Sequence, residues 1–219
     1  MSDFPNLQFN LTQLGDALIA FPFIAVFIIY APKLWEALLT SSIISIIVTS
    51  SLKRIFAVPR PAAFFDQSDF TIVGVPLTGH SSLPSGHSIC TFIVITLLLF
   101  AFMPKKNKIV WTTFIILLGL VIAFSRVAVG AHYPLDVIIG CAIGFIVSII
   151  SIKLSNRITL FAWIKNTKYY PIFILIFTIW GILIVKKILQ INLPIFYISL
   201  LPLLITIYLM TRFYVRKNK

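Results

Sequence analysis

Long apolar segments constrain this chain more than any other feature of its sequence. Seven segments of about 20 residues each are apolar enough, or nearly so, to cross a bilayer, and they lie at 12–31, 35–56, 84–103, 109–126, 135–154, 169–186 and 191–212. Charged residues make up only 11% of the chain, whereas soluble domains carry about 25%. We therefore predict an all-α, polytopic transmembrane helix bundle of about six to seven spans, forming a single domain over residues 1–219.

The distribution of charge predicts the orientation of the bundle. With the N-terminus outside, twelve of the eighteen Lys and Arg residues fall on the inner side, and cytoplasmic loops of membrane proteins collect such residues. These twelve are Lys33, Lys105, Lys106, Lys108, Lys153, Arg157, Lys165, Lys168, Arg212, Arg216, Lys217 and Lys219. The outer side receives Lys53, Arg54, Arg60, Arg126, Lys186 and Lys187, together with the acids Asp3, Asp16, Asp66, Asp69 and Asp136; only Glu36 is inner. This predicts a cytoplasmic C-terminus.

A net charge of +12 would raise nucleic acid as a partner for a soluble protein. The inward bias of the basic residues explains the charge here, and no nucleic-acid motif accompanies it. Cys90 and Cys141 both lie in apolar segments, where a thiol usually acts as a small hydrophobic group. We expect no cleaved signal peptide, because the first eleven residues are polar and lack a basic start.

Three polar motifs interrupt the apolar pattern, and all fall on the predicted outer side. The first runs from Lys53 to Pro61, and Lys53 and Arg60 are seven residues apart. They share a face if the helix continues; alternatively, Pro59 and Pro61 end the helix and turn Arg60 back over it. Either arrangement directs two cations at one dianion. Taken alone, a basic flank that extends to the membrane surface explains this motif better.

The second motif, from His80 to His87, directly precedes an apolar segment. Pro84 fits the first position of a helix, so Ser85 and Gly86 would offer backbone N–H groups to an anion at the helix N-terminus. His87 would stand just inside the helix, able to transfer a proton near neutral pH. An ordinary Ser/Pro helix start with an interfacial His explains this motif equally well.

The third motif runs from Ser125 to Asp136 and places Arg126, His132 and Asp136 between two apolar segments. Pro134 suits a helix start, and Asp136 in the first turn can reach back to His132. A carboxylate on one ring nitrogen fixes the tautomer and leaves the other nitrogen free to attack. Asp136 could simply complement the helix dipole, but that role does not account for Arg126 and His132.

Metal-dependent phosphate chemistry needs clustered carboxylates and imidazoles, and this chain has only six acidic residues. Lys53, Arg60 and Arg126 would instead offset the phosphate charge. The sequence therefore favours phosphate transfer through a phosphohistidine without a metal or other cofactor. From the residues alone, either His132 or His87 could be the nucleophile.

Taken together, the three motifs resemble the signature of the type-2 phosphatidic acid phosphatase superfamily. That signature is Lys, six residues, Arg-Pro; then Pro-Ser-Gly-His; then Ser-Arg, five residues, His, three residues, Asp. The chain fills every position in order, between residues 53 and 136, and the apolar segments over 169–212 are additional C-terminal spans. The resemblance implies a six-helix core and a reaction without metal.

The resemblance also implies a role for each residue. His132 would be the nucleophile, oriented by Asp136, and His87 would protonate the leaving oxygen. The remaining signature residues would hold the phosphate: Lys53, Arg60, Ser85, Gly86 and Arg126. His80, in a loop, and Asp16, at the outer end of the first segment, fall outside the signature.

We therefore expect an integral membrane phosphatase of the cytoplasmic membrane with its active site on the outer face. It would remove the terminal phosphate of a lipid phosphate or diphosphate: undecaprenyl diphosphate, which is slightly preferred, phosphatidylglycerol phosphate, phosphatidic acid or lipid A. Its expected partners are this lipid and the bilayer, with no nucleic acid or obligatory protein. The alternatives are a lipid phosphotransferase with the same site and a lipid-phosphate transporter or binding protein without turnover.

Overall fold

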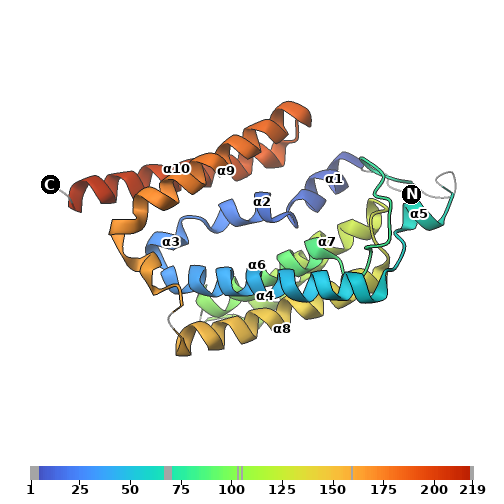
Figure 1. Cartoon of the computed structure of the whole chain (residues 1–219), viewed down its shortest axis with the longest axis horizontal. Coiled ribbons are helices and arrows are strands. Elements are labelled where there is room, and N and C mark those ends of the chain that lie inside the picture. The colour runs from blue at the N-terminus through green and yellow to red at the C-terminus, as the bar shows by residue number, and fades with distance from the viewer. Residues whose placement is uncertain (1–4, 67–70, 103, 105, 159, 218–219) are drawn as a thin grey trace.

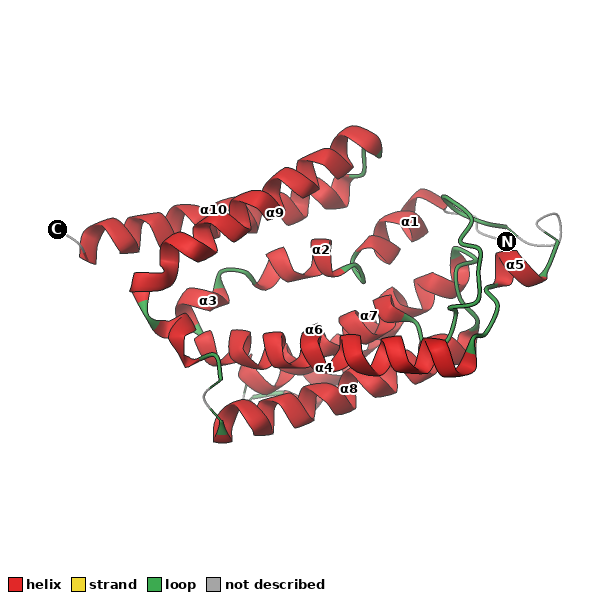
Figure 2. Cartoon of the chain, viewed as in Figure 1, coloured by secondary structure: helices red, strands yellow, loops and turns green. Residues whose placement is uncertain are grey.

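The computed structural model describes residues 5–66, 71–102, 104, 106–158 and 160–217, and every regular element in these ranges is a helix (Figures 1 and 2). The six long helices are α4 (Pro32–Phe56), α6 (Gly86–Phe102), α7 (Lys108–Ala128), α8 (Pro134–Arg157), α9 (Tyr170–Gln190) and α10 (Pro194–Lys217). Five of these are long and apolar enough to cross a membrane, and α6 is a shorter apolar helix. The predicted fold class is confirmed. Asp3, Asp69, Lys105 and Lys219, which entered the charge count, lie outside the described residues.

The short elements lie at the N-terminus and in the two longer connections. They are α1 (Pro5–Gln13), α2 (Ala17–Ala20), η1 (Phe21–Ile24), α3 (Phe27–Tyr30), α5 (Pro61–Phe64), η2 (Ala162–Lys165) and η3 (Thr167–Tyr169). The connection after α8 thus contains two short 3₁₀ helices.

The prediction of one continuous helix over 12–31 is wrong. This segment consists of α2, η1 and α3, each four residues long, after the separate helix α1. Asp16 starts a new helix by accepting a hydrogen bond from the Leu18 N–H (3.0 Å), as N-cap residues do. Pro22 lies in η1, where its missing N–H removes a helical hydrogen bond. Hydropathy alone does not reveal such breaks.

Neighbouring helices satisfy the carbonyl groups of this broken segment. Trp180 Nε1 donates to the Leu18 carbonyl (2.8 Å), Ser199 Oγ to Ile19 (2.9 Å) and Trp35 Nε1 to Ile24 (3.0 Å). Irregular backbone at membrane depth is tolerated only where protein or a water-filled cavity surrounds it. The segment is accordingly central: Figure 1 shows it between the α9–α10 pair and the group formed by α4, α6, α7 and α8.

Two glycines bring α6 and α8 into close contact. A Cβ at Gly140 would stand 2.7 Å from the Ser85 carbonyl oxygen, and a Cβ at Gly144 would stand 2.5 Å from the Ile89 carbonyl oxygen. Small residues four apart allow helix backbones to approach closely in membranes. This contact fixes the start of α6 beside the start of α8, where the second and third polar motifs lie.

A buried acid, Glu36, helps to link α4 to α8 and η2 at the end of the bundle opposite the polar motifs. Glu36 on α4 is 1% exposed and lies 3.0 Å from Lys33 Nζ and 3.5 Å from Lys165 Nζ. Lys33 also donates to the Ser155 carbonyl near the end of α8 (2.8 Å). Glu36, the one acidic residue predicted on the inner side, therefore lies beside two cations that offset its charge.

Candidate active site

The three polar motifs meet at one end of the bundle, opposite the C-terminus (Figure 1). The first follows the end of α4, the second leads into α6, and the third connects α7 to α8. Backbone hydrogen bonds join them: Ser82 N donates to the Val58 carbonyl (3.0 Å), and Ser85 N donates to the Asp136 carbonyl (3.1 Å). Residues that span more than eighty positions of sequence thus form one cluster.

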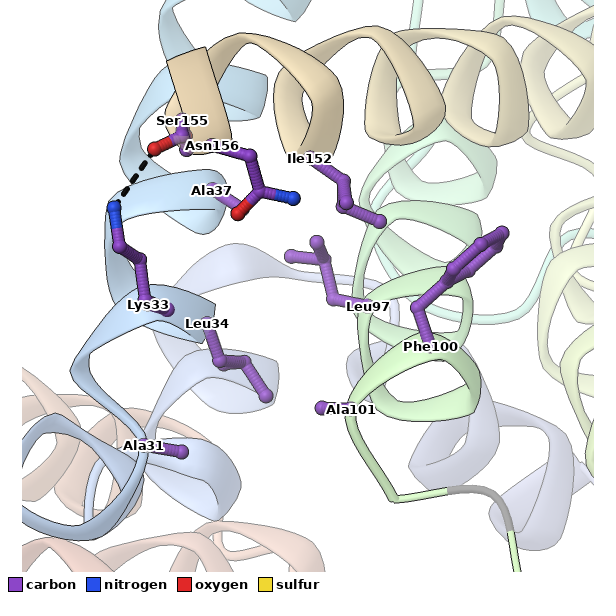
Figure 3. Close-up of a pocket in the computed structure, with 10 residues that line it drawn as sticks. All are labelled: Ala31, Lys33, Leu34, Ala37, Leu97, Phe100, Ala101, Ile152, Ser155 and Asn156. Atoms are coloured by element: carbon purple, nitrogen blue, oxygen red, sulfur yellow. Dashed lines mark hydrogen bonds between the residues drawn. The ribbon is translucent and has the colours of Figure 1, made fainter. Parts of the chain in front are cut away.

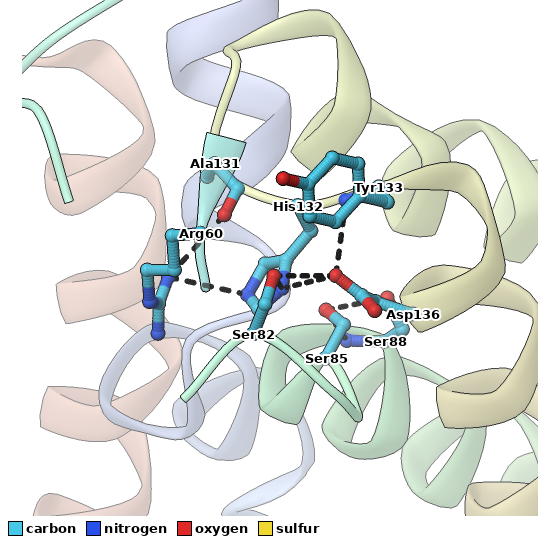
Figure 4. A network of polar contacts seen from close by, with 8 residues as sticks. All are labelled: Arg60, Ser82, Ser85, Ser88, Ala131, His132, Tyr133 and Asp136. Atoms are coloured by element: carbon cyan, nitrogen blue, oxygen red, sulfur yellow. Dashed lines mark hydrogen bonds and ion pairs between the residues drawn. The ribbon is translucent and has the colours of Figure 1, made fainter. Parts of the chain in front are cut away.

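His132 and Asp136 form a buried pair at the centre of this cluster (Figure 4). They are 4% and 2% exposed, and His132 Nδ1 lies 3.4 Å from Asp136 Oδ2. The same oxygen accepts a hydrogen bond from the Tyr133 N–H (3.0 Å), which completes a capping box at the start of α8. The contact expected between Asp136 and His132 is therefore present, and it places the Nδ1 proton on the carboxylate side.

The other ring nitrogen of His132 faces a cation. Arg60 Nη1 lies 3.5 Å from His132 Nε2 and donates to the Ala131 carbonyl (3.3 Å). With Nδ1 protonated toward Asp136, Nε2 carries the lone pair and is the nitrogen able to attack phosphorus.

Ser82 is a third member of this group, and the sequence predicted no role for it. Its hydroxyl donates to Asp136 Oδ2 (2.5 Å) and lies 3.4 Å from His132 Nδ1, and the residue is fully buried. The sequence offers little signal for it, because Ser82 falls outside the three-part signature.

Arg60 reaches the pair because α4 ends before it. Ala57 has a left-handed backbone (φ 42°) and caps α4 after Phe56, as residues at helix C-termini do. Arg60 is extended, and its N–H donates to the Gly79 carbonyl (2.9 Å). Of the two predicted arrangements, the helix end with Arg60 turned back is the one found. Lys53, in the last turn of α4, lies near enough for its charge to interact with those of Arg60, Asp136 and Arg126.

One of the two backbone donors predicted for an anion site at the start of α6 is already engaged. The helix begins at Gly86, two residues later than predicted. The Ser85 N–H is already bound to the Asp136 carbonyl, and Ser85 Oγ accepts a hydrogen bond from Ser88 Oγ (2.9 Å). Ser85 therefore joins α6 to α8 instead of offering its N–H to an anion. Gly86 fits the expectation better, since no atom lies within 4 Å of where its Cβ would stand.

Arg126 lies at the end of α7 and is 6% exposed. Its Nη1 donates to Thr12 Oγ1 of α1 (2.9 Å), and its carbonyl accepts from the N–H groups of Ala131 and His132. The turn between them needs Gly130, whose φ is 73°, a value that glycine adopts readily. Arg126 thereby fixes the backbone that carries His132.

The environment lowers the pKa of His132 below the ordinary value for an imidazole. Burial is the main cause, because it penalises the charged form, and the charges of Arg60 and Arg126 act in the same direction; contact with Asp136 opposes them. His132 is therefore neutral at neutral pH, the form in which Nε2 is a nucleophile.

Two cavities adjoin this cluster. One, of about 420 Å³, is mainly apolar and is lined by Pro61, Phe65, Val127, Gly130, His132, Tyr133 and Pro134. The other, of about 250 Å³, is more polar and contains His87 and Arg126. The two catalytic imidazoles expected from the sequence thus line neighbouring spaces at the same end of the molecule.

A further cavity of about 280 Å³ lies at the opposite end, between α4, α6 and α8 (Figure 3). It contains no signature residue. Its cation, Lys33, is already engaged by the Ser155 carbonyl and by Glu36. This cavity is therefore separate from the candidate active site.

Comparisons with known proteins identify the family and the fold. The pattern of the PAP2 superfamily matches residues 33–160. The lipid A 1-phosphatase of Rhizobium etli is 34% identical over 119 residues, which cover 53% of this chain and 48% of that protein, so the match spans about half the length of this relative. The undecaprenyl-diphosphatase of Sulfolobus acidocaldarius is 30% identical over 154 residues, covering 69% of this chain and 70% of that protein.

A solved structure shares the fold. The crystal structure of Aquifex aeolicus LpxE aligns with a TM-score of 0.58 and 28% identity, over 68% of this chain and 85% of that one. Three findings therefore coincide: the family pattern over more than half of the chain, the shared fold, and the convergence of the three motifs. This chain belongs to the PAP2 superfamily.

Proposed function

We propose that this protein is an integral membrane phosphatase that hydrolyses the terminal phosphate of a lipid phosphate or diphosphate through a phosphohistidine. The observation that carries the proposal is the buried His132–Asp136 pair, with His132 Nε2 directed toward Arg60. Binding a phosphate requires only cations. A neutral imidazole held by a carboxylate is the arrangement expected of a nucleophile.

The proposed reaction has two steps. His132 Nε2 attacks phosphorus, an N–P bond forms, and the P–O bond to the lipid breaks while His87 gives its proton to the leaving oxygen. His87 then removes a proton from water, the resulting hydroxide attacks the phosphohistidine, and phosphate leaves. Lys53, Arg60 and Arg126 offset the charge on the phosphoryl oxygens, and the open side of Gly86 allows an oxygen to approach the start of α6.

Three features support a lipid substrate. The helices are long and apolar enough for a membrane, the cavity beside His132 is mainly apolar, and two relatives bear the names lipid A 1-phosphatase and undecaprenyl-diphosphatase. We place the site on the outer face of the cytoplasmic membrane, because most basic residues fall at the opposite end.

The test is phosphate release by the purified protein from undecaprenyl diphosphate, phosphatidylglycerol phosphate, phosphatidic acid and lipid A. His132→Ala should lower kcat by about 10³-fold or more, since it removes the nucleophile. His80→Ala is the matched control, because His80 is exposed and outside the signature. A phosphoenzyme that is stable in alkali and labile in acid should form in the wild type and not in His132→Ala.

Full activity of His132→Ala would reassign the nucleophile, and lipid binding without release of phosphate from any substrate would indicate a binding protein. Transfer of labelled phosphate to a second lipid, instead of water, would indicate a phosphotransferase.

We also propose that the reaction needs no metal, because the cations of the site are side chains and few carboxylates are available to hold an ion. Activity should persist after treatment with EDTA. Loss of activity that a divalent cation restores would contradict this part of the proposal.

A further inference from the structure

The cavity beside His87, the more polar of the two, takes most of its polar lining from parts of the chain outside the family pattern. It has a volume of about 250 Å³, and apolar residues of the loop before α6 form part of its lining. Its polar lining consists of Thr12, Gln13, Asp16, His87, Arg126 and Lys187. Four of these six residues lie outside residues 33–160, which the family pattern matches.

Lys187 is held in a fixed position at this cavity. Its ammonium group lies 2.6 Å from Asp16 Oδ2 and 5.6 Å from the centre of the Phe196 ring. The other oxygen of Asp16 caps α2 by accepting from the Leu18 N–H. An ammonium has three N–H donors, so the bond to Asp16 leaves two that other acceptors can use. Asp16, which falls outside the signature, thus both starts α2 and positions Lys187.

Arg126 contributes further donors to the same cavity. Its side chain is buried, and Nη1 is bound to Thr12, while Nε has no hydrogen-bond partner among the described residues. A buried guanidinium with an unsatisfied donor is costly in the absence of a ligand. The cavity is therefore richer in donors than in acceptors and suits an anionic ligand with several oxygens.

We propose that this cavity binds the second phosphate of a lipid diphosphate, the phosphate that stays on the lipid after hydrolysis, and that Lys187 determines the preference for diphosphates. This inference rests on the proposed function, and in particular on His87 as the proton donor to the leaving oxygen. In a diphosphate, that oxygen belongs to the second phosphate. The second phosphate must therefore lie on the His87 side of the site.

Charge gives the physical reason for a cation at this place. When the bond between the two phosphates breaks, negative charge develops on the second phosphate, and a fixed ammonium stabilises that charge. Asp16 and Lys187 both lie near enough to His87 for their charges to act on its imidazole. A lipid monophosphate leaves a neutral hydroxyl instead, which gains little from Lys187.

The decisive measurement is the ratio of kcat/KM for a polyprenyl diphosphate to kcat/KM for phosphatidic acid. Lys187→Met should lower this ratio by tenfold or more. Lys186→Met is the matched control, because Lys186 is the adjacent basic residue of α9, is exposed and does not line the cavity; it should leave the ratio unchanged. An equal loss on both substrates, or an unchanged ratio, would overturn the inference.

The variant Lys187→Met leaves the Asp16 carboxylate without its ion-pair partner, which could disturb His87 or the fold. The double variant Asp16→Asn/Lys187→Met removes that charge as well and should show the same fall in the ratio. A ratio restored to the wild-type value in the double variant would show that unpaired Asp16, and not the lost ammonium, caused the effect, and would contradict the inference.

A free phosphate ion is the alternative ligand for this cavity, because it carries the same oxygens and charge as the second phosphate of the lipid. Inhibition of phosphatidic acid hydrolysis by inorganic phosphate should have the same inhibition constant in the wild type and in Lys187→Met. A constant that rises in Lys187→Met would assign the cavity to free phosphate and contradict the assignment to substrate. Failure of the proposed function is distinguishable, because the wild type would then release phosphate from neither lipid.

Discussion

Ser82 contacts both members of the His132–Asp136 pair and has no access to solvent. Its hydroxyl gives Asp136 a second donor beside the Tyr133 N–H, so the carboxylate is held in place from two directions. A carboxylate that orients a histidine must itself be oriented. Ser82 is therefore a positioning residue for the proposed nucleophile.

We predict that Ser82→Ala lowers kcat by about tenfold to a hundredfold, the range expected for loss of a hydrogen bond to a charged group. The protein should stay folded, because a hydroxyl is replaced by a smaller apolar group. Ser81→Ala is the neighbouring control and should keep wild-type kcat. Equal activity of both variants would show that the Ser82 hydroxyl does not position the pair.

The environment of His132 predicts a pH dependence. Because burial, Arg60 and Arg126 lower its pKa below about 6.5, the imidazole stays neutral down to more acidic pH than a free histidine. An NMR titration of the His132 ring in detergent micelles should therefore give a midpoint below 6.5. Asp136→Asn removes a contribution that raises the pKa and should move the midpoint lower still. A higher midpoint in Asp136→Asn would contradict the assigned cause.

At the scale of elements, the close contact of α6 and α8 places the proposed proton donor beside the proposed nucleophile. His87 is in the first turn of α6, and Asp136 is in the first turn of α8. Gly140 and Gly144 allow this approach by leaving no side chain between the helix backbones. The glycines of α8 are thus part of the geometry of the site although they touch no substrate.

We predict that Gly144→Ala destabilises the protein by about 1–3 kcal/mol, the usual cost of overpacking. The added Cβ would lie 2.5 Å from a backbone oxygen of α6, which cannot move independently of its helix. Gly181→Ala is a matched control in α9, where the nearest atoms would be 3.7 and 3.8 Å away. Thermal unfolding in detergent should show a lower Tm for Gly144→Ala alone, accompanied by lower kcat. A Tm equal in both variants would argue against the tight contact.

At the scale of the whole molecule, the polar motifs and most of the basic residues lie at opposite ends of the bundle. The motifs surround the starts of α6 and α8, whereas Arg216 and Lys217 end α10 and Arg157 ends α8. Since basic residues accumulate on the cytoplasmic side of membranes, this arrangement predicts an outward-facing site.

A cysteine-labelling experiment tests this orientation. In a background carrying Cys90→Ala and Cys141→Ala, Thr78→Cys should react with an impermeant maleimide on intact cells. Thr78 is exposed in the loop before α6. Lys217→Cys, exposed at the end of α10, should react only after the membrane is permeabilised. The reverse pattern would place the site in the cytoplasm.

The sequence by itself determined the class of fold and supplied the residues that we propose for the site. Apolar segments long enough to span a bilayer predicted where most of the long helices begin and end to within a few residues. They could do so because hydropathy depends on composition over a local window. The spacing of the three motifs, through its resemblance to the family signature, predicted a site formed by His132, Asp136, His87 and nearby cations. Pro59 and Pro61 allowed the end of α4 to be anticipated, since proline acts locally on the backbone.

Only the tertiary structure decided what depends on contacts between distant segments. The predicted helix over 12–31 is broken, and the carbonyls freed by the breaks are stabilised by donors from α4, α9 and α10. Ser85 gives its N–H to α8 instead of offering it to an anion. Lys187 meets Asp16 across 171 residues of sequence. Hydrogen bonds and ion pairs form between groups that folding brings together, and no local pattern of residues specifies such partners in advance.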